Sequence, residues 1–104
     1  MLIVTTENIP GRTYQTIGLV KGTIVQSKNV ARDFMAGLKT IVGGEIKGYT
    51  QMMMEARNIA TDRMIAEATA LGADAVVMVR YASSAVMQNS AEVIAYGTAV
   101  KFLS

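Results

Sequence analysis

The chain has 104 residues and a formal net charge of +2, and 51% of its residues are hydrophobic against 17% that are charged. This length predicts one domain, residues 1–104, whose apolar surface exceeds what so small a core can bury, so we expect a partner to cover the remainder. The chain contains neither cysteine nor histidine, which excludes disulfides, thiolate chemistry, triads built on imidazole and the usual Cys and His zinc sites.

The first part of the chain predicts two strands. Residues 2–5 form a short apolar run that ends at turn-forming residues in segment 8–11. Residues 13–27 then carry β-branched and aromatic side chains in partial alternation, with apolar residues on both sides, so we expect both faces of this strand to be covered. Within it, Gly18 and Gly22 predict a bulge, a bend or a close approach of another backbone.

Two helices are expected next. The first follows Asn29, a typical N-cap residue, and ends at residues 43–44, which are both glycine. The second begins between residues 45 and 50 and runs to Leu71, with Gly72 as its C-cap residue. The predicted buried stripe of this second helix consists of Met53, Ala56, Ala60, Met64, Ala68 and Leu71.

Two further strands complete the predicted elements. Residues 75–82 are apolar on both sides and predict an interior strand, the polar residues of 83–90 predict a turn, and residues 91–102 return as a strand. The order ββααββ favours an α+β fold, in which an antiparallel sheet carries two helices packed on one face.

The charges and apolar runs also indicate which partners to expect. The basic residues form no clustered patch interleaved with aromatic side chains, so we expect no nucleic-acid partner. The longest apolar run, residues 75–79, is far shorter than the roughly 20 residues that cross a bilayer. The first seven residues lack the features of a secretory signal. These features predict a cytoplasmic protein without a membrane partner.

Three segments resemble the YbjQ-like family. They are GLKTIVGGEIKGYT (37–50) with EAR (55–57), LGADAVV (71–77) and EVIAYGTAV (92–100), which follow the family's motifs in the same order. The resemblance covers nearly the whole chain and implies a subunit of a homo-oligomeric ring, with a pentamer as the implied assembly. The family is labelled as heavy-metal-binding, so a metal ion is implied as a cofactor by the label alone.

Methionine sulfur and carboxylate or carbonyl oxygen are the metal ligands available to this chain. Thioethers of Met52, Met53 and Met54 would suit Cu(I). Successive helix residues point about 100° apart, however, so these three cannot converge on one ion within one subunit. Methionines more often fill gaps in a core or an interface. A metal site would therefore have to be shared between subunits.

The densest polar group consists of Glu45, Lys47, Tyr49 and Arg57, next to glycines that allow close approach. Glu45 could act as a base or a hard-cation ligand, Lys47 and Arg57 could hold an anion, and Tyr49 could donate a hydrogen bond. A simpler interpretation is helix-start chemistry, with the Glu45 carboxylate favoured by the helix dipole and Arg57 paired with Glu45 or with a neighbouring subunit. No catalytic residue is assigned.

Two charge pairs are also expected. Arg80 and Glu92 lie on strands that flank one turn, where opposite charges could meet across the strands. Arg63 and Glu67 are four residues apart on the second helix and predict a surface pair.

These features favour a ring-forming homo-oligomer of unassigned biological role, more a binding protein than an enzyme, with any ligand held at subunit interfaces lined by residues 43–57. One alternative is a metal-binding module with carboxylate or thioether ligands shared between subunits. The other is a small-molecule-binding protein or small enzyme that uses residues 45–57.

Overall fold

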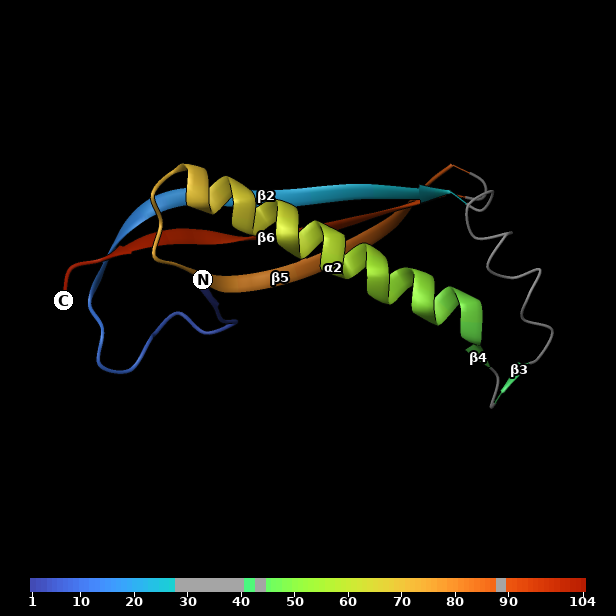
Figure 1. Cartoon of the computed structure of the whole chain (residues 1–104), viewed down its shortest axis with the longest axis horizontal. Helices are drawn as coiled ribbons and strands as arrows, with labels where there is room; N and C mark the ends of the chain where they lie inside the picture. The colour runs from blue at the N-terminus through green and yellow to red at the C-terminus, as the bar shows by residue number, and fades with distance from the viewer. Residues whose placement is uncertain (28–40, 43–44, 88–89) are drawn as a thin grey trace.

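A four-stranded sheet and a long helix that lies across it make up most of the protein (Figure 1). The computed structural model describes residues 1–27, 41–42, 45–87 and 90–104. This arrangement confirms the predicted α+β class. Its elements are β1 (Leu2–Ile3), β2 (Tyr14–Ser27), β3 (Ile41–Val42), β4 (Glu45–Ile46), α2 (Lys47–Ala70), β5 (Ala75–Met87) and β6 (Ser90–Phe102).

The sheet is mixed, which corrects the expectation of an antiparallel sheet. Its strand order is β1-β5-β6-β2, and β5, β6 and β2 are antiparallel neighbours. β1 instead pairs parallel to β5, and Val4 N–H donates to the Val76 carbonyl over 3.0 Å. The chain leaves β1, passes through a turn in which Gly11 has a φ of +78°, and enters the sheet again at its far edge as β2.

One helix lies in the part of the chain that the structure describes, so the predicted two helices and the order ββααββ are not found. The first predicted helix falls mostly on residues 28–40, which lie outside the described residues. Ile41 and Val42, expected near its end, form β3 and pair antiparallel with β4. Both are β-branched, and their stiff side chains favour extended backbone.

The second predicted helix is confirmed as α2, and so is its stop at Gly72. Gly72 has a φ of +78°, which an L side chain adopts only with strain. Its N–H donates to the Thr69 carbonyl over 3.0 Å, and Ala73 N–H donates to the Ala68 carbonyl over 3.0 Å. This pair of bonds is the Schellman motif, which satisfies carbonyls left free at a helix end.

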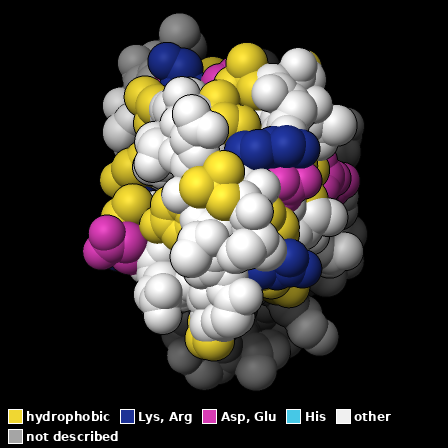
Figure 2. Space-filling view, turned by 90° about the vertical axis from the view of Figure 1, so that its left-hand side faces the viewer, with side chains coloured by type: hydrophobic (Ala, Val, Ile, Leu, Met, Phe, Trp, Pro, Cys, Tyr) yellow, Lys and Arg dark blue, Asp and Glu magenta, His cyan; other side chains and the backbone are white. Residues whose placement is uncertain are grey.

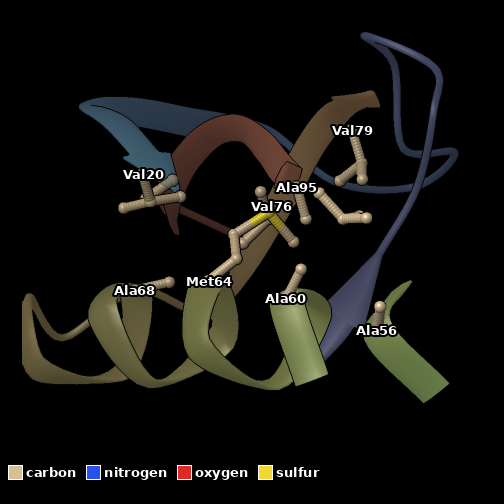
Figure 3. Packing of buried hydrophobic residues seen from close by; sticks show 10 residues of the cluster. Val20, Ala56, Ala60, Met64, Ala68, Val76, Val79 and Ala95 are labelled. Atoms are coloured by element: carbon tan, nitrogen blue, oxygen red, sulfur yellow. The ribbon is translucent and has the colours of Figure 1, made fainter. Parts of the chain in front are cut away.

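α2 buries an alanine-rich stripe against β2 and β6, and Met64 reaches from this stripe towards Val76 and Ala95 in the sheet (Figure 3). The stripe agrees with the prediction except at its ends, where Leu71 is exposed and Met52 is buried in place of Met53. Leu71 follows the last helical residue, so the terminating turn directs it to solvent. The fully buried stripe residues are Ala56, Ala60, Met64 and Ala68.

Both glycine predictions in β2 are confirmed. The register with β6 shifts between Thr16 and Gly18, as expected for a bulge. Gly22 lies directly under α2, because a Cβ atom added there would overlap the Ala60 carbonyl oxygen and the Met64 amide nitrogen. Small residues on both elements therefore set the short distance between helix and strand.

β5 extends further than predicted. Ser83 and Ser84, expected in a turn, continue β5 and pair with Val93 and Glu92 of β6. Serine is common in turns because its hydroxyl can bond nearby backbone groups, but here the partner strand already satisfies that backbone. The predicted interior position of β5 is confirmed, since it lies between β1 and β6.

The expected charge pairs are not found. Because β5 continues to Met87 and β6 begins at Ser90, Arg80 pairs with Tyr96, while Glu92 lies opposite Ser84. The register also shifts by one residue between Val77 and Arg80, where Met78 has a φ of +52°. The Arg80 guanidinium donates to the Thr5 carbonyl over 2.9 Å. Arg63, expected to pair with Glu67, instead donates to the Thr23 carbonyl of β2 over 2.6 Å.

The sheet face opposite α2 is only partly covered. At one end, Ile9 of the N-terminal segment packs with Ala75, Val77 and Val100. Further along, nothing in the described subunit covers Leu19 on β2, which is 64% exposed. The expectation that both faces of this strand are covered is therefore wrong for the subunit alone.

The carboxylate of Asp74 connects the segment after α2 to the end of β6. Asp74 accepts a hydrogen bond from Phe102 N–H over 2.8 Å and lies 3.4 Å from Lys101 Nζ. The Phe102 N–H lowers the pKa of the Asp74 carboxyl, outweighing the opposite effect of partial burial, and Lys101 lowers this pKa further. Figure 2 views this end of the molecule, where positive and negative side chains lie next to each other among hydrophobic and neutral ones.

The lowered pKa of Asp74 predicts an acid-dependent loss of stability. A carboxyl whose folded pKa is depressed stabilises the fold above its unfolded pKa, and this stabilisation disappears as pH falls through the folded value. We expect the urea concentration at the unfolding midpoint of the wild type to decrease when the pH is lowered below about 4. The same decrease should be smaller in Asp74→Asn. Asp62→Asn, which removes one charge from an exposed position of α2, should keep the wild-type slope. Parallel wild-type and Asp74→Asn curves would contradict the prediction.

Candidate functional site

The predicted site residues lie along the β4–α2 segment. Glu45 belongs to β4, and Lys47 and Tyr49 belong to the first turn of α2, but their side chains lie outside what the structure describes. Arg57 lies on α2 with an exposed side chain. Convergence of the four side chains on one ligand therefore stays a prediction.

Arg57 lines a pocket between the N-terminal half of α2 and the sheet. The pocket has a volume of about 160 Å³. α2 packs mainly on β2 and β6 and has little contact with β5. The pocket lies between the helix and β5. The lining residues are Met53 and Arg57 from α2, Tyr81, Ala82 and Ser83 from β5, and Val93 from β6.

A chain of hydroxyl groups fixes the tyrosine at the pocket wall. Thr61 Oγ1 lies 2.7 Å from the Arg57 carbonyl oxygen, to which it donates, and 2.8 Å from Tyr81 Oη. A threonine hydroxyl has one hydrogen, so Thr61 must accept from Tyr81. The Tyr81 proton is thereby directed to the helix, and the tyrosine oxygen keeps acceptor capacity only.

The Arg57 guanidinium is the cationic group of the pocket. The salt bridge found among the described side chains is between Lys101 and Asp74. No described carboxylate pairs with Arg57. Arginine carries five donors in a planar fork that matches the two oxygens of a carboxylate. With Ser83 as a further donor, the pocket can bind an anion, while Met53 and Val93 offer apolar contact.

A smaller hollow adjoins this pocket at β5 and β6. It has a volume of about 60 Å³ and is lined partly by Ser84, Glu92 and Ile94. This volume is enough for about two water molecules, so we assign no organic ligand to it.

The β5 side of the pocket was not predicted from the sequence. Tyr81 and Ser83 pair with residues of β6 on the face that α2 covers, since Ser83 lies opposite Val93. A signal was present, because residues 79, 81 and 83 alternate as one face of a strand. The two adjacent serines, which are typical of a turn, obscured it.

These observations define a small α+β protein with an arginine-bearing pocket between helix and sheet. The chain belongs to the YbjQ-like family, since the family model YbjQ_1, described as "Putative heavy-metal-binding", matches residues 1–103. It is 62% identical over 103 residues to a UPF0145 protein of Clostridium novyi, covering 99% of this chain and all of the relative. A UPF0145 protein of Thermotoga maritima is 57% identical over 102 residues, covering 97% of this chain and 96% of the relative.

A solved structure has the same fold. It is the crystal structure of a protein of unknown function from the DUF74 family of Pediococcus pentosaceus, with a TM-score of 0.70. The match covers 98% of this chain and 97% of the other, at 19% sequence identity. The likeness therefore extends to the fold.

The residues present do not fit the heavy-metal description of the family model. The whole chain lacks cysteine and histidine, the ligands that soft and transition metals favour most. Among the described residues, no group of three or more acidic side chains is placed to hold an ion. Met52 is buried, Met53 lines the pocket and Met54 is 54% exposed, so the three neighbouring thioethers diverge as predicted. We therefore derive no chemistry through a metal.

The described residues also include no helix that is both long and apolar enough to cross a membrane.

Proposed function

We propose that this chain is a subunit of a ring-shaped homo-oligomer that serves in binding or assembly, and not in catalysis. The proposal takes residues 1–104 as one domain and a pentamer as the arrangement to test first. It places the protein in the cytoplasm, without a nucleic-acid or membrane partner, in keeping with a cysteine-free chain that carries no clustered basic patch.

The accessible surface of the subunit is the observation that carries this proposal. The chain exposes 6609 Å², whereas a compact folded monomer of 11.1 kDa exposes about 5,700 Å². The excess is roughly 900 Å², which is close to the area that one partner buries in a standard protein interface, about 800 Å². A second copy of the chain would account for this area.

The shape of the subunit supports the same proposal. Its radius of gyration is 16.7 Å, against about 13 Å for a compact domain of this length. β2 forms one edge of the sheet, and its open face carries Leu19 and Val25, which are 64% and 55% exposed. Large exposed side chains on an edge strand favour association, so we place one subunit contact on the open face of β2.

The side-chain types present in this chain favour a binding role over a catalytic one. A chain without histidine or cysteine has no side chain whose unperturbed pKa lies near neutrality. The Tyr81 hydroxyl is engaged with Thr61, which removes one candidate proton donor from the pocket. Binding therefore explains the arrangement with fewer assumptions than catalysis.

The assembly is tested by native mass spectrometry. We expect the wild type to form a closed oligomer of more than two subunits, and the double variant Leu19→Glu with Val25→Glu to shift towards monomer. Two carboxylates buried in a contact without partners oppose association, since each carries a desolvation cost of several kcal/mol.

Leu103→Glu is the matched control, because Leu103 is 65% exposed but lies at the other end of the chain, beyond β6. Its oligomeric state should equal that of the wild type. A wild-type monomer at micromolar concentration would refute the assembly. An unchanged oligomer in the double variant would remove β2 from the interface.

A further inference from the structure

We infer that the pocket between α2 and β5 binds a short-chain carboxylate, with the carboxylate at Arg57 and Ser83 and the hydrocarbon part on Met53 and Val93. This inference goes beyond the assembly proposed above, and it is argued from side chains of a single subunit.

The polar groups of the pocket favour an anionic ligand. Arg57 contributes the positive charge, and no described carboxylate neutralises it. Ser83 adds a hydroxyl donor at the β5 wall. The Tyr81 hydroxyl donates to Thr61 and so leaves Arg57 and Ser83 as the side-chain donors of the lining. A guanidinium and a nearby hydroxyl match the two oxygens of one carboxylate.

The volume limits the size of this anion. The pocket holds about 160 Å³, close to the roughly 150 Å³ of an engineered cavity that accepts benzene, a ligand of about six non-hydrogen atoms. Drug-sized ligands occupy pockets of about 300 to 1,000 Å³. The pocket is partly open to solvent, so a nucleotide or a peptide would leave most of its atoms outside it, whereas a carboxylic acid of about four carbons fits within it.

The apolar half of the lining distinguishes a carboxylate from inorganic phosphate. Val93 is 1% exposed and forms part of the lining, with Met53 from the helix above it. Contact with these side chains stabilises the hydrocarbon part of a ligand, because it removes apolar surface from water. Phosphate would lose hydration against the same surface and find one cation for its charge, so it should bind more weakly.

Methyl NMR of the intact protein tests this inference whatever its oligomeric state. Methionine methyls are labelled with ¹³C, Met53→Leu assigns the pocket resonance, and butyrate is the probe. We expect the Met53 methyl to shift saturably, with a dissociation constant below about 10 mM. The Met54 methyl, which is exposed and lines no part of the pocket, should stay in place.

Arg57→Gln should weaken butyrate binding at least about tenfold, and Ser83→Ala should weaken it several-fold. Arg12→Gln removes the same charge from the far end of the sheet, where Arg12 lies over the Phe102 ring, and should leave the affinity unchanged. Unchanged thermal unfolding of each variant would show that the fold is intact.

Three results would overturn the inference. They are the absence of saturation at about 50 mM butyrate, equal affinity of wild type and Arg57→Gln, and inorganic phosphate binding as tightly as butyrate. None of them bears on the subunit count, so failure here is distinguishable from failure of the assembly proposal.

Discussion

Gly22→Ala is expected to lower the free energy of unfolding by about 3 kcal/mol. The added methyl group would overlap the Ala60 carbonyl oxygen and the Met64 amide nitrogen, and would lie 2.7 Å from Arg63 Cβ. The first two atoms belong to the backbone of α2, so no rotamer change can relieve the overlap. The helix would have to move away from β2, and its buried stripe would lose packing with the sheet.

Chemical denaturation at a fixed protein concentration measures this loss, because the stability of a protein that self-associates depends on its concentration. Thr23→Ala is the matched control. Thr23 is the next residue of β2 and is half-buried, with its side chain on the opposite face. It should lose less than about 1 kcal/mol. A Gly22→Ala variant as stable as Thr23→Ala would contradict the close contact between helix and strand.

Met64→Ala is the second substitution with a large expected effect. Met64 is fully buried and fills the space between α2 and the sheet (Figure 3), whereas the other fully buried stripe residues of α2 are alanines. Truncating it removes the largest fully buried side chain of the protein's described part and leaves a cavity. We expect the free energy of unfolding to fall by about 3 kcal/mol.

Met54→Ala provides the comparison, since it makes the same chemical change at a residue of α2 that is 54% exposed. Its loss should stay within about 0.5 kcal/mol. The two variants are compared by their urea midpoints under identical conditions. Equal midpoints would mean that Met64 does not occupy the core position described here.

Most of α2 and β2 was predictable because their signals are local. Helical spacing from Ala56 to Ala68 marked the buried stripe, and Gly72 marked the end of the helix. Each of these signals depends on backbone geometry within a few residues. Leu71 continued the same spacing but lay one residue beyond the helix, where periodicity no longer applies.

The candidate site was predictable only in part. Arg57 was identified from the density of polar groups near α2's start, and the structure places it in a pocket. Tyr81 and Ser83 complete this pocket from a strand more than 20 residues further along the chain. No local pattern connects them to Arg57, because the contact exists only once α2 has packed across the sheet.

Strand pairing shows the same limit. β1 and β2 are neighbours in sequence, yet they lie at opposite edges of the sheet. The prediction of the Arg80 and Glu92 pair placed a turn at residues 83–90, whereas β5 continues to Met87 and puts Ser84 opposite Glu92. The positive φ of Met78, where the register shifts by one further residue, was not predicted either. An unfavourable backbone conformation at a non-glycine residue persists only where surrounding structure imposes it.

The sequence by itself determined the α+β class, the long helix with its glycine stop, the glycines of β2 and the exclusion of histidine and cysteine chemistry. Periodicity, glycine geometry and composition are properties of the chain before it folds. Tertiary structure alone decided the parallel pairing of β1 with β5, the uncovered face of β2 and the pocket that joins Arg57 to Tyr81. These features arise from contacts between distant segments, whose free energy depends on how whole elements pack.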